Sequence, residues 1–133
     1  MAVKHANDET FAEMIGTGIT LVDFWAAWCG PCRMFGPIFE ETSDKLSDVN
    51  FIKFEIDETN RRTPAKYGIR SIPCVLAFKN GELVEARTGL MDGDTLIDWV
   101  KELNNGNWKL QDDWITIKIY TEKERTLYVP NAL

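Results

Sequence analysis

The sequence predicts an α/β fold in which a mixed β-sheet of five strands is flanked by four helices. Two observations lead to this prediction. Strand-like segments alternate with helical segments over the first three strands, the order that builds parallel strands with crossover helices. A fourth and a fifth strand then form an antiparallel pair around Asn80-Gly81, a strong signal for a two-residue hairpin turn. The chain of 133 residues is long enough for one domain with a substantial core.

Two strands and two helices are predicted in the first part of the chain. Val3–His5 is a candidate edge strand, and Asn7 is a candidate cap for a short helix. The apolar face of that helix is Phe11, Met14 and Ile15. Thr20–Trp25 is an almost continuous apolar run, typical of a strand that is covered on both faces. A long helix is predicted from Cys29 to Leu46, with Pro37 inside it as an expected kink. Its inward residues are Phe35, Ile38, Phe39, Thr42 and Leu46.

The next segments complete the sheet. Phe51–Ile56 is the third strand, and Asn60–Tyr67 is a short helix that Gly68 ends. Cys74–Phe78 and Leu83–Thr88 are the two strands of the hairpin. A last helix ends in Asn104-Asn105-Gly106, and its apolar stripe is Leu96, Trp99, Val100 and Leu103. These elements predict a domain of residues 1–105 with helices on both faces of the sheet.

Residues 106–133 do not continue this pattern. Trp114–Tyr120 alternates between two faces and Thr126–Val129 is a candidate return strand, so a β-hairpin extension is expected. One interpretation packs the extension on the domain, where its apolar residues are Trp108, Trp114, Ile115, Ile117 and Ile119. The other makes it an interface for a homodimer or a dedicated partner. Exposed alternating strands promote aggregation, which favours packing.

Composition narrows the range of functions. The formal net charge is −6 and no dense Lys/Arg cluster is present, which argues against direct nucleic-acid binding. No segment approaches the roughly 18 consecutive apolar residues of a membrane helix, and the N-terminus lacks the apolar core of a signal peptide. We therefore expect a cytoplasmic protein that does not enter membranes. Three cysteines are too few for a disulfide scaffold, so their reactivity is the more informative property.

The segment Cys29-Gly30-Pro31-Cys32 directly follows a predicted buried strand and opens a helix. Free backbone N–H groups at a helix start favour negative charge, which acidifies the Cys29 thiol and supplies the thiolate that attacks disulfides. Cys32 lies one turn further on the same side, where it can attack a mixed disulfide formed at Cys29. Pro31 is tolerated because its missing N–H would lack a partner in the first turn.

A zinc half-site is the main alternative for this cysteine pair. A structural zinc site usually has four ligands, and the remaining candidates, Cys74 and His5, are wrongly spaced. We therefore expect no metal. A purely structural disulfide is rare in a cytosolic protein. The chain also has no phosphate-cradling glycine motif, so we expect no bound cofactor.

The sequence around the cysteines, Asp23-Phe24-Trp25-Ala26-Ala27-Trp28-Cys29-Gly30-Pro31-Cys32, resembles the active-site signature of the thioredoxin family. Ser71-Ile72-Pro73, Phe78-Lys79-Asn80-Gly81 and Gly89 match further elements of that family, and the resemblance covers roughly residues 3–105. It implies a thioredoxin fold and protein disulfide reductase activity on disulfide-containing proteins. It also implies electrons from NADPH through a flavin-containing thioredoxin reductase.

Asp23 is unusual because it interrupts the apolar run of a buried strand, where a charge is costly. It is either a strand-end carboxylate that faces water or a desolvated acid with a raised pKa that exchanges a proton with Cys32. The resemblance favours the second interpretation, because the family has a buried aspartate here. It also matches Lys53 to a lysine that tunes this aspartate. The alternative for Lys53 is a surface-facing strand lysine.

The resemblance also assigns substrate-binding residues. It implies a cis peptide bond before Pro73 and substrate pairing by the backbone of Ile72. Trp28, Ile72 and Gly89 would then form an apolar docking surface that recognises extended peptide through its main chain. Cys74 departs from the family, which usually has threonine there. It is either a small buried residue or a third redox centre.

Two other functions compete with the reductase. Members of the thioredoxin family also serve as structural subunits of larger assemblies, including a viral DNA polymerase, and the extra C-terminal segment gives weight to such a binding role. The other alternative is an oxidant in an exported compartment. The Gly-Pro pair between the cysteines argues against the oxidant, because it accompanies reducing members of the superfamily.

Overall fold

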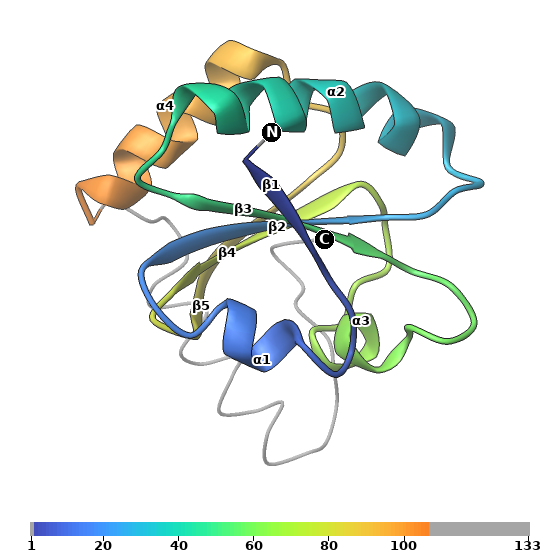
Figure 1. The fold of residues 1–133 in the computed structure, drawn as a ribbon. Helices are drawn as coiled ribbons and strands as arrows, with labels where there is room; N and C mark the ends of the chain where they lie inside the picture. The colour runs from blue at the N-terminus through green and yellow to red at the C-terminus, as the bar shows by residue number, and fades with distance from the viewer. Residues whose placement is uncertain (1, 107–133) are drawn as a thin grey trace.

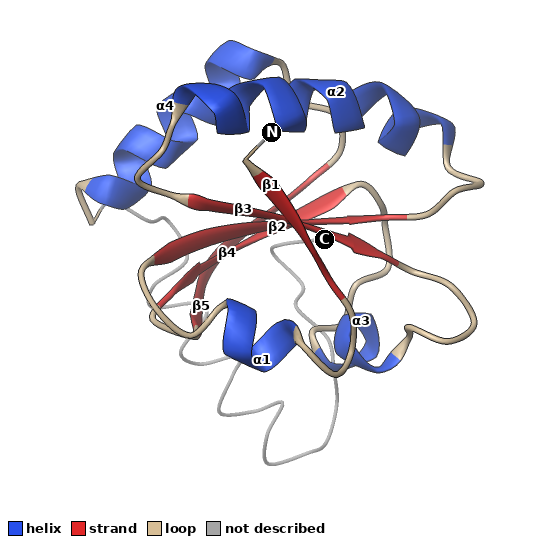
Figure 2. Cartoon of the chain, viewed as in Figure 1, coloured by secondary structure: helices blue, strands red, loops and turns tan. Residues whose placement is uncertain are grey.

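The computed structural model describes residues 2–106, which form a five-stranded sheet between two pairs of helices (Figure 1). The strands are β1 (Val3–Ala6), β2 (Ile19–Trp25), β3 (Asn50–Glu55), β4 (Cys74–Lys79) and β5 (Glu82–Thr88). The helices are α1 (Phe11–Met14), α2 (Gly30–Lys45), α3 (Arg62–Lys66) and α4 (Gly93–Asn104). Figure 2 shows α2 and α4 on one face of the sheet and α1 and α3 on the other. The predicted α/β class and element order are confirmed.

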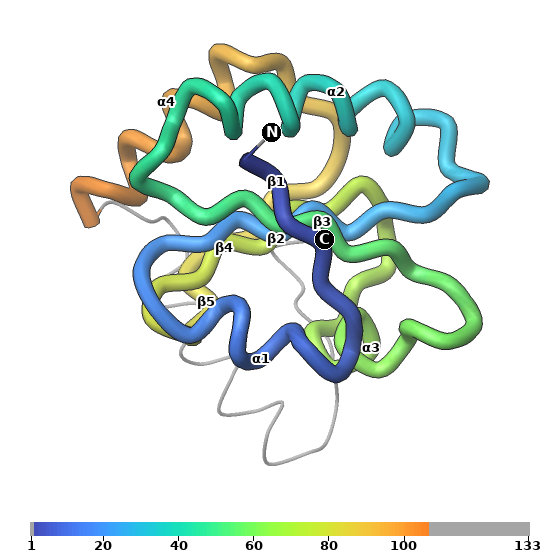
Figure 3. Tube along the Cα trace, in the orientation of Figure 1, coloured from blue at the N-terminus to red at the C-terminus, as the bar shows by residue number. Residues whose placement is uncertain are grey.

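The sheet has the strand order β1-β3-β2-β4-β5, so β2 lies at its centre. β1 and β2 both pair with β3 in parallel, whereas β4 pairs antiparallel with β2 and with β5. The chain path in Figure 3 shows β1 in front of β3 at one edge. The register places Asp23 of β2 between Lys53 of β3 and Val75 of β4. A charged residue thus lies in the middle of the sheet.

The turn between β4 and β5 is the predicted two-residue hairpin. Asn80 and Gly81 both have positive φ angles, of 49° and 86°. Two successive positive values are typical of the turn whose twist matches the flanking strands, and Asn and Gly adopt them at the lowest cost. The Asn80 side-chain carbonyl also accepts a hydrogen bond from the Gly18 N–H at 2.8 Å. The hairpin is therefore tied to the start of β2.

Each face of the sheet has its own apolar core, because successive strand residues point to opposite faces. The core under α2 and α4 contains Leu21, Phe35, Phe39, Phe51, Val75, Ala77, Leu96, Trp99, Val100 and Leu103. The core over α1 and α3 contains Phe11, Ile15, Val22, Phe24, Ile52, Phe54, Cys74, Leu76 and Phe78. Asp23 follows Leu21 by two residues on β2 and so faces α2.

The ends of the elements differ slightly from the predicted ones. The prediction of Asn7 as the helix cap is wrong, because α1 begins at Phe11 and its N-cap is Thr10. The Asn7 side chain instead accepts hydrogen bonds from the N–H groups of Glu9 and Thr10, before the helix begins. α3 is shorter than predicted at both ends, and Gly68 follows it with a φ of 66°. Apart from Gly106, the predicted C-terminal hairpin of residues 106–133 lies outside the described residues, and so does its proposed interface. None of the described helices is long and apolar enough to cross a membrane.

Candidate active site

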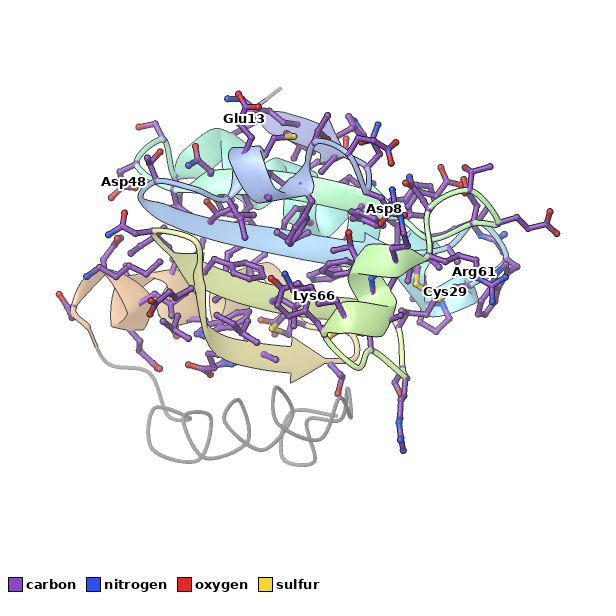
Figure 4. The ribbon with its side chains drawn as sticks, turned by 90° about the horizontal axis from the view of Figure 1, so that it is seen from below. Asp8, Glu13, Cys29, Asp48, Arg61 and Lys66 are labelled. Carbon is purple, nitrogen blue, oxygen red and sulfur yellow. A yellow bond between two sulfur atoms is a disulfide. The ribbon has the colours of Figure 1, made fainter. Side chains whose placement is uncertain are left out.

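The cysteine pair lies where the central strand passes into the longest helix. β2 ends at Trp25, and the loop that follows is closed by a hydrogen bond from the Cys29 N–H to the Ala26 carbonyl at 3.1 Å. Figure 4 shows Cys29 at one end of the molecule, far from Asp48, which precedes β3 at the other end. The β2 strand therefore presents the pair at the carboxyl end of the parallel strands.

Cys29 and Cys32 are joined by a disulfide, and their Cα atoms are 5.3 Å apart. Cys29 is the N-cap of α2, and its Sγ accepts a hydrogen bond from the Cys32 N–H at 3.2 Å. Gly30 and Pro31 fill the first turn between the two cysteines. A sulfur at this position lies at the positive end of the helix dipole, which favours its thiolate form after reduction. The pair can exchange two electrons with another disulfide.

The predicted docking residues surround this pair. The Ile72–Pro73 peptide bond is cis, as the resemblance implied, and the Ile72 carbonyl oxygen lies 3.8 Å from Cys29 Sγ. The Gly89 N–H donates to the Pro73 carbonyl at 2.8 Å, which places Gly89 beside the proline. Trp28 is 78% exposed next to Cys29. An apolar, solvent-facing surface thus adjoins Cys29, a residue that is itself only 5% exposed.

Asp23 is completely buried, and neither of its carboxyl oxygens has a hydrogen-bond partner within the described part of the chain. Burial raises the pKa of Asp23 to about 7, the Lys53 charge opposes this rise, and the Glu40 charge adds to it. The interpretation of Asp23 as a strand-end carboxylate facing water is therefore wrong. A buried acid that titrates near neutral pH can accept or donate a proton under physiological conditions.

Lys53 lies opposite Asp23 in the β2–β3 register, but its ammonium contacts other groups. Its Nζ is 3.3 Å from Oε2 of Glu40 and 4.9 Å from the ring centroid of Trp25. The Lys53 side chain is 12% exposed, so it is not a surface-facing lysine. Its charge acts on Asp23 from the neighbouring strand, and the two groups do not form an ion pair.

Glu40 is a residue of this site that the sequence reasoning missed. The signal was its spacing: Cys32, Gly36 and Glu40 follow each other at intervals of four along α2 and so share one face. A Cβ atom at Gly36 would lie 3.2 Å from the Lys53 Nζ, closer than ordinary contact. Gly36 therefore leaves the space that the ammonium occupies.

Cys74 is fully buried in the core over α1 and α3, on the face of the sheet opposite α2. Burial, together with the negative charge of Asp23, raises the pKa of Cys74 to about 12. At neutral pH the group is a thiol rather than a nucleophilic thiolate. These observations support the interpretation of Cys74 as a small buried residue. Over residues 2–106, no cluster of three or more His, Cys, Asp or Glu side chains is arranged to hold a metal ion.

Comparisons with known proteins agree with this geometry. The thioredoxin family model matches residues 2–102. Thioredoxin from Rickettsia prowazekii is 45% identical over 103 residues, which cover 75% of this chain and 97% of the relative. Thioredoxin from Bacillus subtilis is 40% identical over 103 residues, covering 77% of this chain and 98% of the relative. The residues matched by the family model include Cys29, Cys32, Asp23 and the Ile72–Pro73 bond. The chain belongs to the thioredoxin family and is a thiol–disulfide oxidoreductase that reduces protein disulfides.

Proposed function

We propose that this reductase works through two successive exchanges at Cys29 and Cys32. The Cys29 thiolate attacks a substrate disulfide, forms a mixed disulfide and releases one substrate thiolate. Cys32 then loses its proton, attacks Cys29 Sγ and releases the second substrate thiolate. Two electrons pass from the dithiol to the substrate, and the Cys29–Cys32 disulfide remains. The observation that carries this proposal is that disulfide, placed at the start of α2 with one sulfur acting as N-cap.

Asp23 is the proposed proton acceptor for Cys32. It lies on the face of β2 that is covered by α2, the helix that carries Cys32, and its pKa of about 7 lies near ambient pH. A general base is most effective when its pKa lies near the working pH. Lys53 and Glu40 set the charge around Asp23. Neither of them touches the reacting sulfurs in this proposal.

The proposed substrate surface is formed by Trp28, Ile72 and Gly89. The Ile72 carbonyl lies 3.8 Å from Cys29 Sγ, so a peptide paired with this backbone would bring its disulfide to the sulfur. Main-chain recognition suits many unrelated proteins as substrates. We further propose that the chain binds no cofactor, that NADPH supplies electrons through thioredoxin reductase, and that the protein acts in the cytoplasm.

An insulin-reduction assay with dithiothreitol tests the reductase mechanism. The wild-type protein is expected to accelerate insulin precipitation, and Cys29→Ser to reduce the rate to that of dithiothreitol alone. When the reduced Cys32→Ser protein is mixed with insulin without dithiothreitol, it is expected to accumulate a mixed disulfide, visible by mass spectrometry, because the first exchange occurs without the second. Cys74→Thr is the matched control and is expected to keep the wild-type rate. Equal rates for wild type and Cys29→Ser would overturn the proposal.

A further inference from the structure

Glu40 and Lys53 form a charge pair beside the buried Asp23. Glu40 lies two turns after Cys32 on the same face of α2, and its Oε2 is 3.3 Å from the Lys53 Nζ. The two side chains are 27% and 12% exposed, so the pair is largely shielded from water. Partial burial strengthens such a contact relative to a surface ion pair. The pair bridges α2 and β3 next to the central strand.

Two further residues define where the ammonium lies. The Trp25 ring is 4.9 Å from Nζ, within the range of a cation–π contact. Gly36 lies on the α2 side, where even a Cβ would come within 3.2 Å of Nζ. Glu40, Trp25 and the backbone at Gly36 thus enclose the ammonium on the helix side of the sheet. This position is specific, whereas a flexible lysine stem would allow several others.

The charged and titratable groups near Asp23 on its own face come from two elements. β3 contributes Lys53, and α2 contributes Glu40 and carries Cys32. β4 contributes only the apolar register partner Val75, and the neighbouring Cys74 thiol lies on the opposite face of the sheet. The side chains that α4 buries over this face are the apolar residues Leu96, Trp99, Val100 and Leu103. On β5, Arg87 is the register partner of Val75 and pairs with Glu85 and Glu102.

A direct ion pair with the Lys53 ammonium would strongly favour the charged form of Asp23. Such a pair would leave a carboxylate that is a poor proton acceptor near neutral pH. In the structure the Asp23 oxygens have no hydrogen-bond partner among the described residues, while Lys53 is bound to Glu40. We propose that Glu40 is a positioning residue, which binds the Lys53 ammonium and thereby prevents it from pairing with the buried Asp23 carboxyl.

This inference deepens the proposed role of Asp23, and its test is a direct titration. The oxidised protein is used, because the joined sulfurs of Cys29 and Cys32 do not titrate. The Asp23 carboxyl is followed by carbon-13 NMR against pH in wild type and in Glu40→Met. Glu40→Met is expected to lower the midpoint by at least about one pH unit, because the released ammonium moves toward Asp23. The matched control is Glu41→Met, which removes the same charge from an exposed pair with Lys45.

The same substitution made in a Lys53→Met protein separates positioning of the ammonium from simple charge repulsion. Glu40 repels the Asp23 carboxylate directly, and this part of its effect does not require Lys53. The proposal therefore expects Glu40→Met to lower the midpoint more in the wild-type background than in Lys53→Met. The proposal is overturned if Glu40→Met leaves the Asp23 midpoint unchanged or lowers it only as much as Glu41→Met does. It is also overturned if Glu40→Met lowers the midpoint equally in the wild-type protein and in Lys53→Met.

The kinetic readout distinguishes this inference from the proposed function. The rate at which the mixed disulfide is resolved is measured against pH in Glu40→Met. A profile displaced to lower pH together with the NMR midpoint supports both proposals. A displaced midpoint with an unchanged rate profile supports positioning by Glu40 and overturns the role of Asp23 as proton acceptor.

Discussion

Asp23 and Lys53 are register partners on adjacent parallel strands, yet the Lys53 ammonium pairs with Glu40 and the Asp23 carboxyl is left without a hydrogen-bond partner among the described residues. A buried carboxyl in this situation is stable when protonated and costly when ionised. The stability of the protein is therefore expected to depend on pH through this one residue, in addition to any effect on catalysis.

Asp23→Asn tests this dependence. The pKa of Asp23 is about 7 in the folded protein and 3.8 in the reference state, so the folded state binds more protons between these values. Wild-type stability should then fall as pH rises from about 4 to about 7 and level off above that. The variant should lack this fall and be more stable at pH 8 by up to about 4 kcal/mol. Urea unfolding of the oxidised proteins at several pH values measures the difference.

The control for this experiment is Asp98→Asn, on an exposed position of α4. Its stability difference from wild type should stay nearly constant with pH. A constant difference for Asp23→Asn as well would contradict a raised pKa at Asp23.

Cys74 is expected to resist alkylation in the folded, reduced protein. Its side chain is fully buried, and its pKa is raised to about 12 by burial and by Asp23, so almost no thiolate is present at pH 7. Brief treatment with iodoacetamide should modify Cys29, and Cys74 should react only after denaturation. Peptide mass spectrometry identifies the modified residues. Rapid native labelling of Cys74 would restore the hypothesis of a third redox centre.

Trp28→Ala is expected to weaken substrate docking while leaving the fold intact. Trp28 is 78% exposed, so its removal leaves no buried cavity and should change the free energy of unfolding by less than about 0.5 kcal/mol. Loss of a large aromatic contact should raise the KM for insulin by about five-fold or more. Steady-state kinetics and urea unfolding of the same preparation separate the two effects. An unchanged KM would remove Trp28 from the docking surface.

Phe11→Ala is expected to destabilise the protein by about 3–5 kcal/mol. Phe11 lies on the four-residue α1, and its ring contacts those of Phe24, Phe54, Tyr67 and Phe78 at centroid distances of 5.5–6.1 Å. Because a helix this short has little stability of its own, the packing of Phe11 holds α1 on the sheet. Urea unfolding measures the loss. A change below about 1 kcal/mol would show that the core over α1 and α3 closes around the missing ring.

Much of the fold follows from local patterns. The apolar run of β2 and the Asn80-Gly81 turn are determined by neighbouring residues, so the sequence alone predicts them. The strand order is different, because β1 pairs with β3 rather than with β2, its sequence neighbour among the strands. Apolar periodicity gives the buried face of a strand and carries no information about which strand lies beside it.

The site shows the same division. Asp23 stands out in the sequence because a charged residue interrupts an apolar run. The cysteine pair stands out because its reactivity depends on the helix that begins at it. Glu40 does not stand out, since a glutamate in a helix is usually a solvated residue. Its importance comes from contact with Lys53, which is 13 positions away and on a different element. Only the packing of α2 on β3 brings these two residues together.

The hydrogen bond from the Cys32 N–H to Cys29 Sγ gives the molecule an internal reporter. Whatever is attached to that sulfur changes its strength as an acceptor, and the amide proton of Cys32 senses the change through its chemical shift. One resonance in a proton–nitrogen spectrum is thus expected to follow the redox cycle of the protein, without an attached dye or a coupled enzyme.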